Sequence, residues 1–302
     1  MRRPLVALLV AGVLVGCAPP RAGSLGPAPT AAPETATSGA TPPAPAPVTP
    51  ATGEPATSGP RSPRPAPPPV TDAPTTAGAV TIELWFVRDG RLVPTRRTRP
   101  STLATSRLAL TELAAGPTVG EAATGMTTLL PAGTEPLGVS GGVATVRLAA
   151  VGGDPRTDRL RRGQVVWTLT QFPTVRRVRF DPPVAAADAP VGRADYADLL
   201  PPIVVTGPTV GQRVTSPLTV TGTADVFEAT VSLRVLDAGG REIATAFTTA
   251  SCGSGCRGDY RAVVTWRAAR EQAGTVEVYE VSANDGSRVN VVRVPVRLAP
   301  AR

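Results

Sequence analysis

The chain of 302 residues contains no histidine and no lysine, so all 31 of its basic residues are arginine. Without histidine there is no Ser-His-Asp or Cys-His catalysis and no histidine-bound metal. Without lysine there is no phosphate-binding loop of the GxxxxGK[ST] kind and no Ser-Lys dyad. These absences exclude the commonest hydrolase and nucleotide-binding chemistries, and we expect no catalytic residue, no metal and no cofactor.

Cysteine is also scarce, and one of the three, Cys17, directly follows a short apolar run. Arg2 and Arg3 precede that run, an order typical of a secretory signal peptide. Residues 5–15 are too few for a membrane-spanning helix, which needs about 20 residues. The sequence LVGC at 14–17 resembles the lipobox of bacterial lipoproteins. The resemblance implies a signal peptide over residues 1–16, a lipid on Cys17 and anchoring at the outer face of the cell membrane; the alternative is an ordinary signal peptide with a chance cysteine.

The other two cysteines, Cys252 and Cys256, lie in CGSGC between two strand-like segments. If Cys17 carries lipid, these two thiols can pair, and export takes them to a compartment where disulfides persist. A Gly-Ser-Gly loop lets their Cα atoms approach within the roughly 4.4–6.8 Å that a disulfide requires. We expect this disulfide at a hairpin tip; the alternative, a zinc site, lacks further ligands.

Residues 17–79 are dominated by proline, alanine and threonine and show no apolar periodicity. Such a segment cannot bury enough apolar surface to fold. We therefore expect a disordered linker that acts as a tether between the lipid and the folded part of the chain.

Residues 80–183 mix strand-like alternation with helical spacing. Asp89-Gly90 is a hairpin turn signal, and Asp154-Pro155 is a helix start. Together these patterns predict a small α+β domain. The expected strands are 80–87, 91–94, 136–140, 143–149 and 175–180, and the expected helices are 103–114 and 155–172.

The order of four segments in this region resembles the GerM-type sporulation and germination (GerMN) domain: LTELAAGPT at 110–118, LLPAGT at 129–134, GGVATVRL at 141–148 and QVVWTLTQFPTVRRVRF at 164–180. One departure is the sequence after the last strand, where Asp181-Pro182-Pro183 replaces the aspartate-glycine turn that family members often have. The resemblance implies an envelope protein of the sporulation or germination type.

Residues 201–302 contain about seven short strand-like runs with turn signals such as 237–240 and 284–286. This spacing predicts an all-β immunoglobulin-like sandwich. The segment PTVGQRVTSPLTVTGTADVFEATV at 208–231 resembles the immunoglobulin-like domain of bacterial spore germination, a frequent companion of GerM-type domains. Residues 184–200 connect the two expected domains.

The net charge of +8 is concentrated in residues 80–183. Such a basic excess fits nucleic acid, anionic lipid or wall polymer. Export and the lack of aromatic residues between the arginines argue against nucleic acid. The alternative is a solvated surface without a ligand. The candidates for an anion-binding face are Arg96, Arg97, Arg99, Arg159, Arg161, Arg162, Arg176, Arg177 and Arg179.

Other motifs have structural interpretations. The G-x-S-x-G match at 138–142 lacks a histidine partner and precedes a strand, so it is interpreted as a hairpin turn. No spacing rule selects a hydrolytic pair among Glu83, Glu112 and Glu228. Phe227 is expected in the core, with Glu228 anchoring a strand end. Core positions are also expected for the tryptophans, Trp85, Trp167 and Trp266.

The sequence therefore predicts a non-catalytic, lipid-anchored envelope protein that binds or scaffolds partners. One hypothesis is an envelope protein partner bound at an exposed sheet edge. A second is peptidoglycan or an anionic wall polymer bound by the arginine-rich first domain. A third, weaker one is glycan hydrolysis.

Overall fold

The computed structural model describes residues 78–149, 153–181 and 189–300. The signal peptide, Cys17 and nearly all of the tether fall outside these ranges, so those predictions stay predictions. Two hydrophobic cores form, one from residues between 82 and 204 and one from residues between 203 and 298. Both belong to the same compact unit of the chain. The fold class is as predicted, with an α+β domain followed by an all-β domain.

The first domain begins with a β-hairpin. β1 (Ala79–Arg88) pairs antiparallel with β2 (Arg91–Pro100) around Asp89 and Gly90, whose φ angles are +52° and +67°. Glycine adopts positive φ freely and aspartate tolerates it, which explains the turn. The other elements are α1 (Thr105–Ala114), α2 (Val119–Ala122), β3 (Glu135–Ser140), β4 (Val143–Arg147), α3 (Pro155–Leu169) and β5 (Arg177–Asp181).

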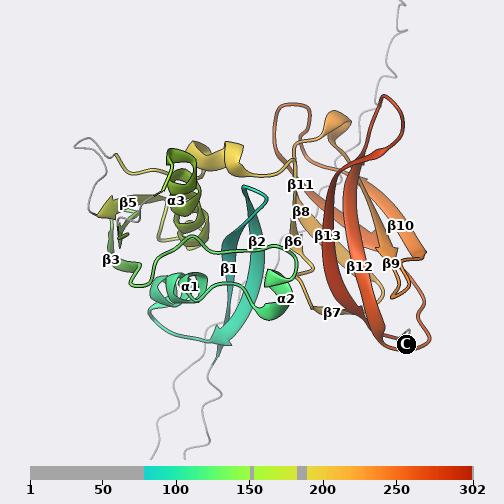
Figure 1. Cartoon of the computed structure of the whole chain (residues 1–302), viewed down its shortest axis with the longest axis horizontal. Helices are drawn as coiled ribbons and strands as arrows, with labels where there is room; N and C mark the ends of the chain where they lie inside the picture. The colour runs from blue at the N-terminus through green and yellow to red at the C-terminus, as the bar shows by residue number, and fades with distance from the viewer. Residues whose placement is uncertain (1–77, 150–152, 182–188, 301–302) are drawn as a thin grey trace, which may run out of the picture. The chain divides into compact units, whose positions relative to one another are not determined.

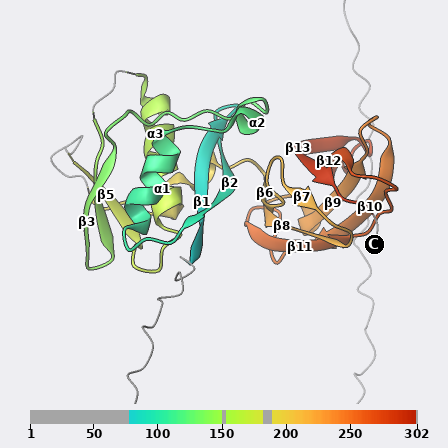
Figure 2. The ribbon, with the colours of Figure 1, turned by 90° about the horizontal axis from the view of Figure 1, so that it is seen from below.

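Helices α1 and α3 lie between two small sheets, as Figure 1 and Figure 2 show. One sheet is the β1–β2 hairpin, and the other has the order β3-β4-β5. α1 contacts β1 and β3, while α3 contacts β1 and β5. Asp154 caps α3 by accepting hydrogen bonds from the amides of Arg156 and Thr157, as its position before Pro155 predicts.

Side chains from α3 and the residues after it close the second edge of β1. Gln164 Nε2 donates to the carbonyl of Trp85 at 2.9 Å, and the Trp85 amide donates to Thr168 Oγ1 at 3.1 Å. The Gln171 amide group bonds both the N–H and the C=O of Glu83 at 2.7 Å. Positions 164, 168 and 171 follow helical spacing along one face. An open strand edge invites pairing with another chain, and these side chains occupy it.

Three details differ from the sequence expectation. α1 begins at Thr105, because the Thr102 hydroxyl bonds the Ala104 amide in a local turn, and Leu103 is therefore fully exposed ahead of the helix. β2 continues to Pro100 through arginines and threonines that apolar periodicity does not register. The short helix α2 was not predicted. The turn between β3 and β4 confirms that the G-x-S-x-G match is a hairpin.

The second domain consists of two sheets that face each other (Figure 2). Their strand orders are β10-β9-β12-β13-β7 and β11-β8-β6. In β8 and β11 every second residue is buried, as a sandwich requires. The elements are β6 (Ile203–Gly207), β7 (Arg213–Val214), β8 (Leu218–Ala224), η2 (Phe227–Ala229), β9 (Thr230–Leu236), β10 (Glu242–Thr249), β11 (Gly258–Val264), β12 (Gln272–Val281) and β13 (Arg288–Leu298).

The segment between the domains contains the 3-10 helix η1 (Arg193–Leu199). Leu199 and Leu200 belong to the first core. In β6, the side chain of Ile203 belongs to the second core and that of Val204 to the first. Successive residues of a strand point to opposite faces, so β6 contributes to both cores.

The prediction for Phe227 is wrong, whereas that for the tryptophans is confirmed. Phe227 is 54% exposed, because its neighbour Val226 takes the buried position before a tight turn. Glu228 lies in that turn with φ +51°. The three tryptophans are buried, with exposed fractions of 3%, 9% and 5% for Trp85, Trp167 and Trp266.

Candidate functional site

The nine arginines predicted to bind an anion lie on β2, on α3 and around β5. On β2, Arg96 pairs with Glu83 at 3.3 Å and Arg99 with Glu112 at 2.7 Å. The hydrogen bond from Arg99 is the main cause that lowers the pKa of Glu112. These guanidinium groups are therefore already engaged with carboxylates of the same domain.

Arg97 is buried, its side chain 9% exposed, and it lies between two carboxylates. Nη1 is 3.0 Å from Glu112 and Nη2 is 2.9 Å from Glu121. Glu121 also accepts hydrogen bonds from the Thr95 hydroxyl and the Thr118 amide. Burial raises the pKa of Glu121, but these bonds and Arg97 outweigh it, so that pKa lies below its ordinary value. Arg97 therefore ties β2 to α1 and α2.

The arginines of α3 are engaged as well. Arg161 and Arg162 contact Asp158 at 3.0 and 2.8 Å, and Arg159 pairs with Asp198. The Arg161 side chain is only 4% exposed. Like Arg97, it does not offer its guanidinium group to solvent.

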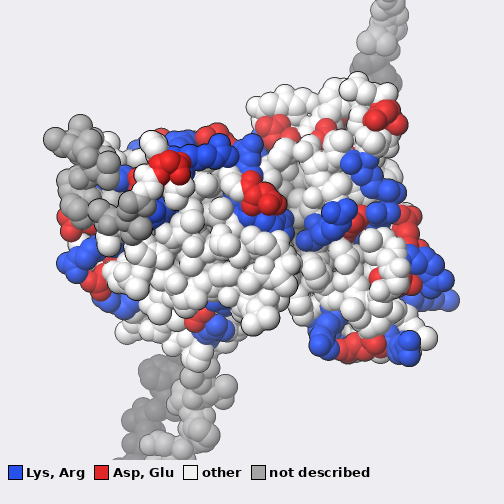
Figure 3. Space-filling model, viewed as in Figure 1, with Lys and Arg blue, Asp and Glu red and all other residues white. Residues whose placement is uncertain are grey.

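Around β5, Arg176 donates to the carbonyl of Gly141 at 3.0 Å and Arg177 to that of Pro190 at 2.9 Å, while Arg179 is exposed. Figure 3 shows arginine and acidic side chains interleaved on the face in view. The structure thus brings most of these arginines to acceptors within the protein. That they bind a wall polymer stays a prediction.

The carboxylates considered for glycan hydrolysis make local contacts. Glu83 accepts a hydrogen bond from Trp85 Nε1 at 2.9 Å in addition to its pair with Arg96. Glu112 accepts from Arg97 and Arg99. Within residues 78–149, 153–181 and 189–300, no group of three or more acidic, cysteine or histidine side chains could hold a metal ion.

The CGSGC loop between β10 and β11 is joined by a disulfide. The Cα atoms of Cys252 and Cys256 are 5.7 Å apart. The Ser254 amide donates to the carbonyl of Val226 at 3.0 Å. A Cβ at Gly253 would collide with the backbone of the turn that follows Val226. The loop is therefore packed against that turn and does not project freely.

A groove of about 740 Å³ is lined by residues of both domains. On the first-domain side, the rings of Trp85 and Trp167 lie 4.6 Å apart, and the Arg193 guanidinium lies 4.6 Å from the Trp167 ring. The Glu83–Arg96 ion pair completes this wall. The volume falls within the range of about 300–1,000 Å³ that is typical of ligand pockets.

The second-domain side of the groove is polar. Thr221 and Thr223 lie on the outer face of β8, and Asp259 of β11 stands opposite Thr223 in the strand register. Thr206 Oγ1 lies 3.2 Å from Thr221 Oγ1. Arg257 closes this wall. The groove therefore presents hydroxyl groups opposite an aromatic wall, with arginine on both sides.

Arg193 and Arg257 line the groove, are half-buried and bond only neutral acceptors. Arg193 donates to Thr170 Oγ1 at 2.8 Å and to the carbonyl of Trp167, and Arg257 donates to the carbonyl of Pro201 at 2.7 Å. Burial lowers the pKa of both side chains, and the charges of Glu83 and Asp225 compensate only in part. Among the described residues neither forms an ion pair with a carboxylate.

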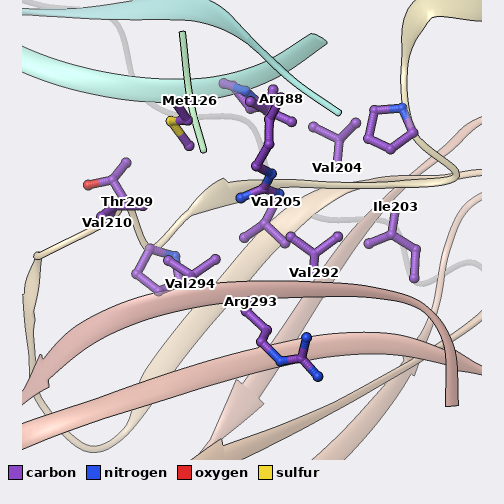
Figure 4. A pocket seen from close by; sticks show the side chains of 14 residues that line it. Arg88, Met126, Ile203, Val204, Val205, Thr209, Val210, Val292, Arg293 and Val294 are labelled. Atoms are coloured by element: carbon purple, nitrogen blue, oxygen red, sulfur yellow. The ribbon is translucent and has the colours of Figure 1, made fainter. Parts of the chain in front are cut away.

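A second cavity beside β6 is too small for a ligand. Its volume is about 20 Å³, room for about one water molecule. Figure 4 shows its lining, which includes Arg88 and Met126 of the first domain and valines of the second. It is a small packing gap in a mostly apolar lining.

Sequence reasoning did not single out Arg193, Arg257 or Asp259. Arg193 lies in a segment interpreted as a connector, and Arg257 directly follows the disulfide loop. Neither position belongs to a motif or to a cluster of charge. Only the packing of distant segments brings these residues to one groove, and no local pattern in the sequence carries that information.

Two family models match the chain. Residues 75–181 match the model described as sporulation and spore germination. Residues 202–287 match the model described as the immunoglobulin-like domain of bacterial spore germination. The chain therefore carries a GerM-type sporulation and germination domain followed by an immunoglobulin-like domain of bacterial spore germination, as the sequence motifs implied.

Among solved structures, the chain is similar to the first GerMN domain of the sporulation protein GerM from Bacillus subtilis, with 23% identity over 38% of this chain and 95% of that one, and a TM-score of 0.31. It is also similar to the tandem GerMN domains of GerM, with 19% identity over 57% of this chain and 60% of that one, and a TM-score of 0.32. A comparison with curated proteins found no match. Among the helices of the described residues, none has the length and apolar character needed to span a bilayer.

Proposed function

We propose that the chain is a non-catalytic, lipid-anchored protein of the cell envelope that binds or scaffolds envelope partners in a process of the sporulation or germination type. The observation that carries the proposal is the succession, in one chain, of two domains that each match a family of bacterial spore germination. The LVGC sequence at 14–17 supports the anchor, and the proline-rich segment after it supports a tether.

In this proposal the lipid on Cys17 fixes one end of the chain and the tether sets how far the two domains reach. Confinement near the membrane raises the effective concentration of the domains toward partners there. Weak individual contacts are then sufficient for assembly.

The contacts of the acidic residues support a binding role over a hydrolytic one. Glu83 and Glu112 each hold an arginine of β2, and Glu121 holds Arg97. A general acid needs a raised pKa, whereas the pKa values of Glu112 and Glu121 are lowered.

Photo-crosslinking in cells tests the proposal. Photo-reactive residues are placed at Arg107 and Arg241, whose side chains are 58% and 81% exposed, whereas the buried Arg97 is unsuitable. Cys17→Ala serves as the unanchored control. We expect a discrete protein adduct that is lost in the control. Adducts to wall material alone, or the same adducts without the anchor, would contradict the proposal.

A further inference from the structure

We propose that the groove bounded by Trp85 and Trp167 on one side and by Thr221 and Thr223 on the other binds a ligand that carries a single carboxylate beside an apolar group, with Arg193 and Arg257 as the anion-binding residues. This inference goes beyond the function proposed above. It concerns a small ligand and holds whether or not the chain is anchored.

The positive charge of the two arginines is only partly compensated within the protein. Both are partly buried, and both spend their hydrogen bonds on carbonyl and hydroxyl oxygens. Nη1 of Arg193 makes no hydrogen bond to the described residues. For a partly buried guanidinium group without a carboxylate in contact, nearby charges offset the cost of desolvation only in part. A ligand carboxylate would supply that partner, in the bidentate geometry that arginine favours.

The net charge of the groove also favours a single carboxylate. Arg96, Arg193 and Arg257 contribute three positive charges, while Glu83 and Asp259 contribute two negative ones. The remaining charge of +1 matches a carboxylate. A phosphate monoester carries about −1.5 to −2 at pH 7 and would exceed it.

The walls of the groove suit a ligand with an apolar body. The indole rings offer apolar contact to the body of a ligand, and the threonine hydroxyls can donate or accept hydrogen bonds. A ligand with a charged end and an apolar body therefore meets suitable groups throughout the groove. A purely ionic or purely apolar molecule would leave one wall unsatisfied.

The test titrates the purified full-length chain, labelled with ¹⁵N, and follows the indole N–H signals of its three tryptophans. Trp85 and Trp167 line the groove, whereas Trp266 lines a different hollow and is an internal control. The probes are matched pairs: cyclohexanecarboxylate with cyclohexanemethanol, and N-acetyl-leucine with N-acetyl-leucinamide. The first pair represents a free organic acid and the second the carboxyl end of a peptide. Cyclohexyl phosphate is the dianionic comparison.

We expect the carboxylates to shift the Trp85 and Trp167 signals in a saturable manner and to leave Trp266 unchanged. In each pair, the shift caused by the acid is compared with the shift caused by its neutral twin. The pair with the larger difference identifies the source of the ligand, a free organic acid or the carboxyl end of a peptide. The proposal is overturned by equal shifts from acid and neutral twin, by no shift from either acid, by a parallel shift of Trp266, or by tighter binding of the phosphate.

Three variants locate the binding. Arg193→Gln and Arg257→Gln should each weaken carboxylate binding by about tenfold, the worth of a charged hydrogen bond. Asp259→Asn should tighten it by about threefold, because it removes a like charge. Its carboxylate makes no hydrogen bond within the described residues, so this variant should fold even if an arginine variant does not. Arg270→Gln, outside the groove and exposed, is the matched control. The assignment would be refuted if the affinity for carboxylates is unchanged in Asp259→Asn and also in each arginine variant that folds.

Discussion

Glu121 keeps a buried arginine paired, and loss of its charge should destabilise the first domain. In Glu121→Gln, Arg97 loses one of its two carboxylates within a site where its own side chain is only 9% exposed. We expect the free energy of unfolding to fall by about 3 kcal/mol, as for a broken buried ion pair. Urea unfolding followed by tryptophan fluorescence measures this. Glu135→Gln, which breaks two exposed pairs with Arg107 and Arg147, is the control and should cost less than about 1 kcal/mol.

The same carboxylates predict how stability depends on pH. The pKa values of Glu112 and Glu121 lie below the ordinary value of about 4.3. A carboxyl group with a depressed pKa contributes stability that is fully present above its unfolded pKa and is lost as the pH falls through its folded pKa. We expect the stability of the first domain to decline below about pH 5, and to decline less in Glu121→Gln. Equal pH profiles of the two proteins in urea unfolding would contradict this.

Residues whose structure depends on sequence neighbours could be predicted, and residues whose structure depends on distant partners could not. The cap at Asp154 and the turn at Asp89 follow from local chemistry. Arg97 resembles a surface charge in sequence, because the carboxylates that bury it come from other elements. Phe227 has the composition of a core residue, but the turn after Val226 directs it outward. The groove arginines fall in the second class for the same reason.

At the scale of elements, the contact between α3 and β1 depends on a buried glutamine. Gln164 is fully buried and bonds both the Trp85 carbonyl and the Leu129 amide. Gln164→Leu leaves those two groups unpaired, and we expect a loss of about 2 kcal/mol or more in the free energy of unfolding. Gln171→Leu removes similar bonds at a half-buried position, where water can replace them, and should cost less. Equal losses in thermal unfolding would show that burial is not the reason.

The disulfide loop should stabilise the second domain locally. Closing so short a loop restricts the unfolded chain and is worth about 2 kcal/mol. The double variant Cys252→Ser, Cys256→Ser should therefore unfold at a lower temperature with the fold retained. A reductant should lower the unfolding temperature of the unsubstituted protein to that of the double variant. It should not change the unfolding temperature of the double variant. A response of the variant to reductant would contradict this explanation.

At the scale of the whole molecule, β6 contributes to both cores, and adjacent substitutions should separate the two contributions. Val204→Ser removes apolar packing from the first core, and Ile203→Ser removes it from the second. Each should cost about 2 kcal/mol or more. Unfolding in denaturant is followed by the indole N–H signals. Val204→Ser should lower the midpoint denaturant concentration reported by Trp85 and Trp167. Ile203→Ser should lower the midpoint reported by Trp266. The same signals responding to both variants would show that the two cores unfold as one.

If the chain is anchored as proposed, the side chains that close β1 have a further consequence. Molecules confined to a membrane meet one another in two dimensions, at high local density, and an unpaired strand would then template pairing from one copy to the next. Such pairing would need the backbone N–H and C=O groups of Glu83 and Trp85. These groups are already hydrogen-bonded to the side chains of Gln164, Thr168 and Gln171. Anchored copies of this chain would therefore be unable to pair a strand with Glu83 and Trp85, and lateral contacts between them would have to use other surfaces.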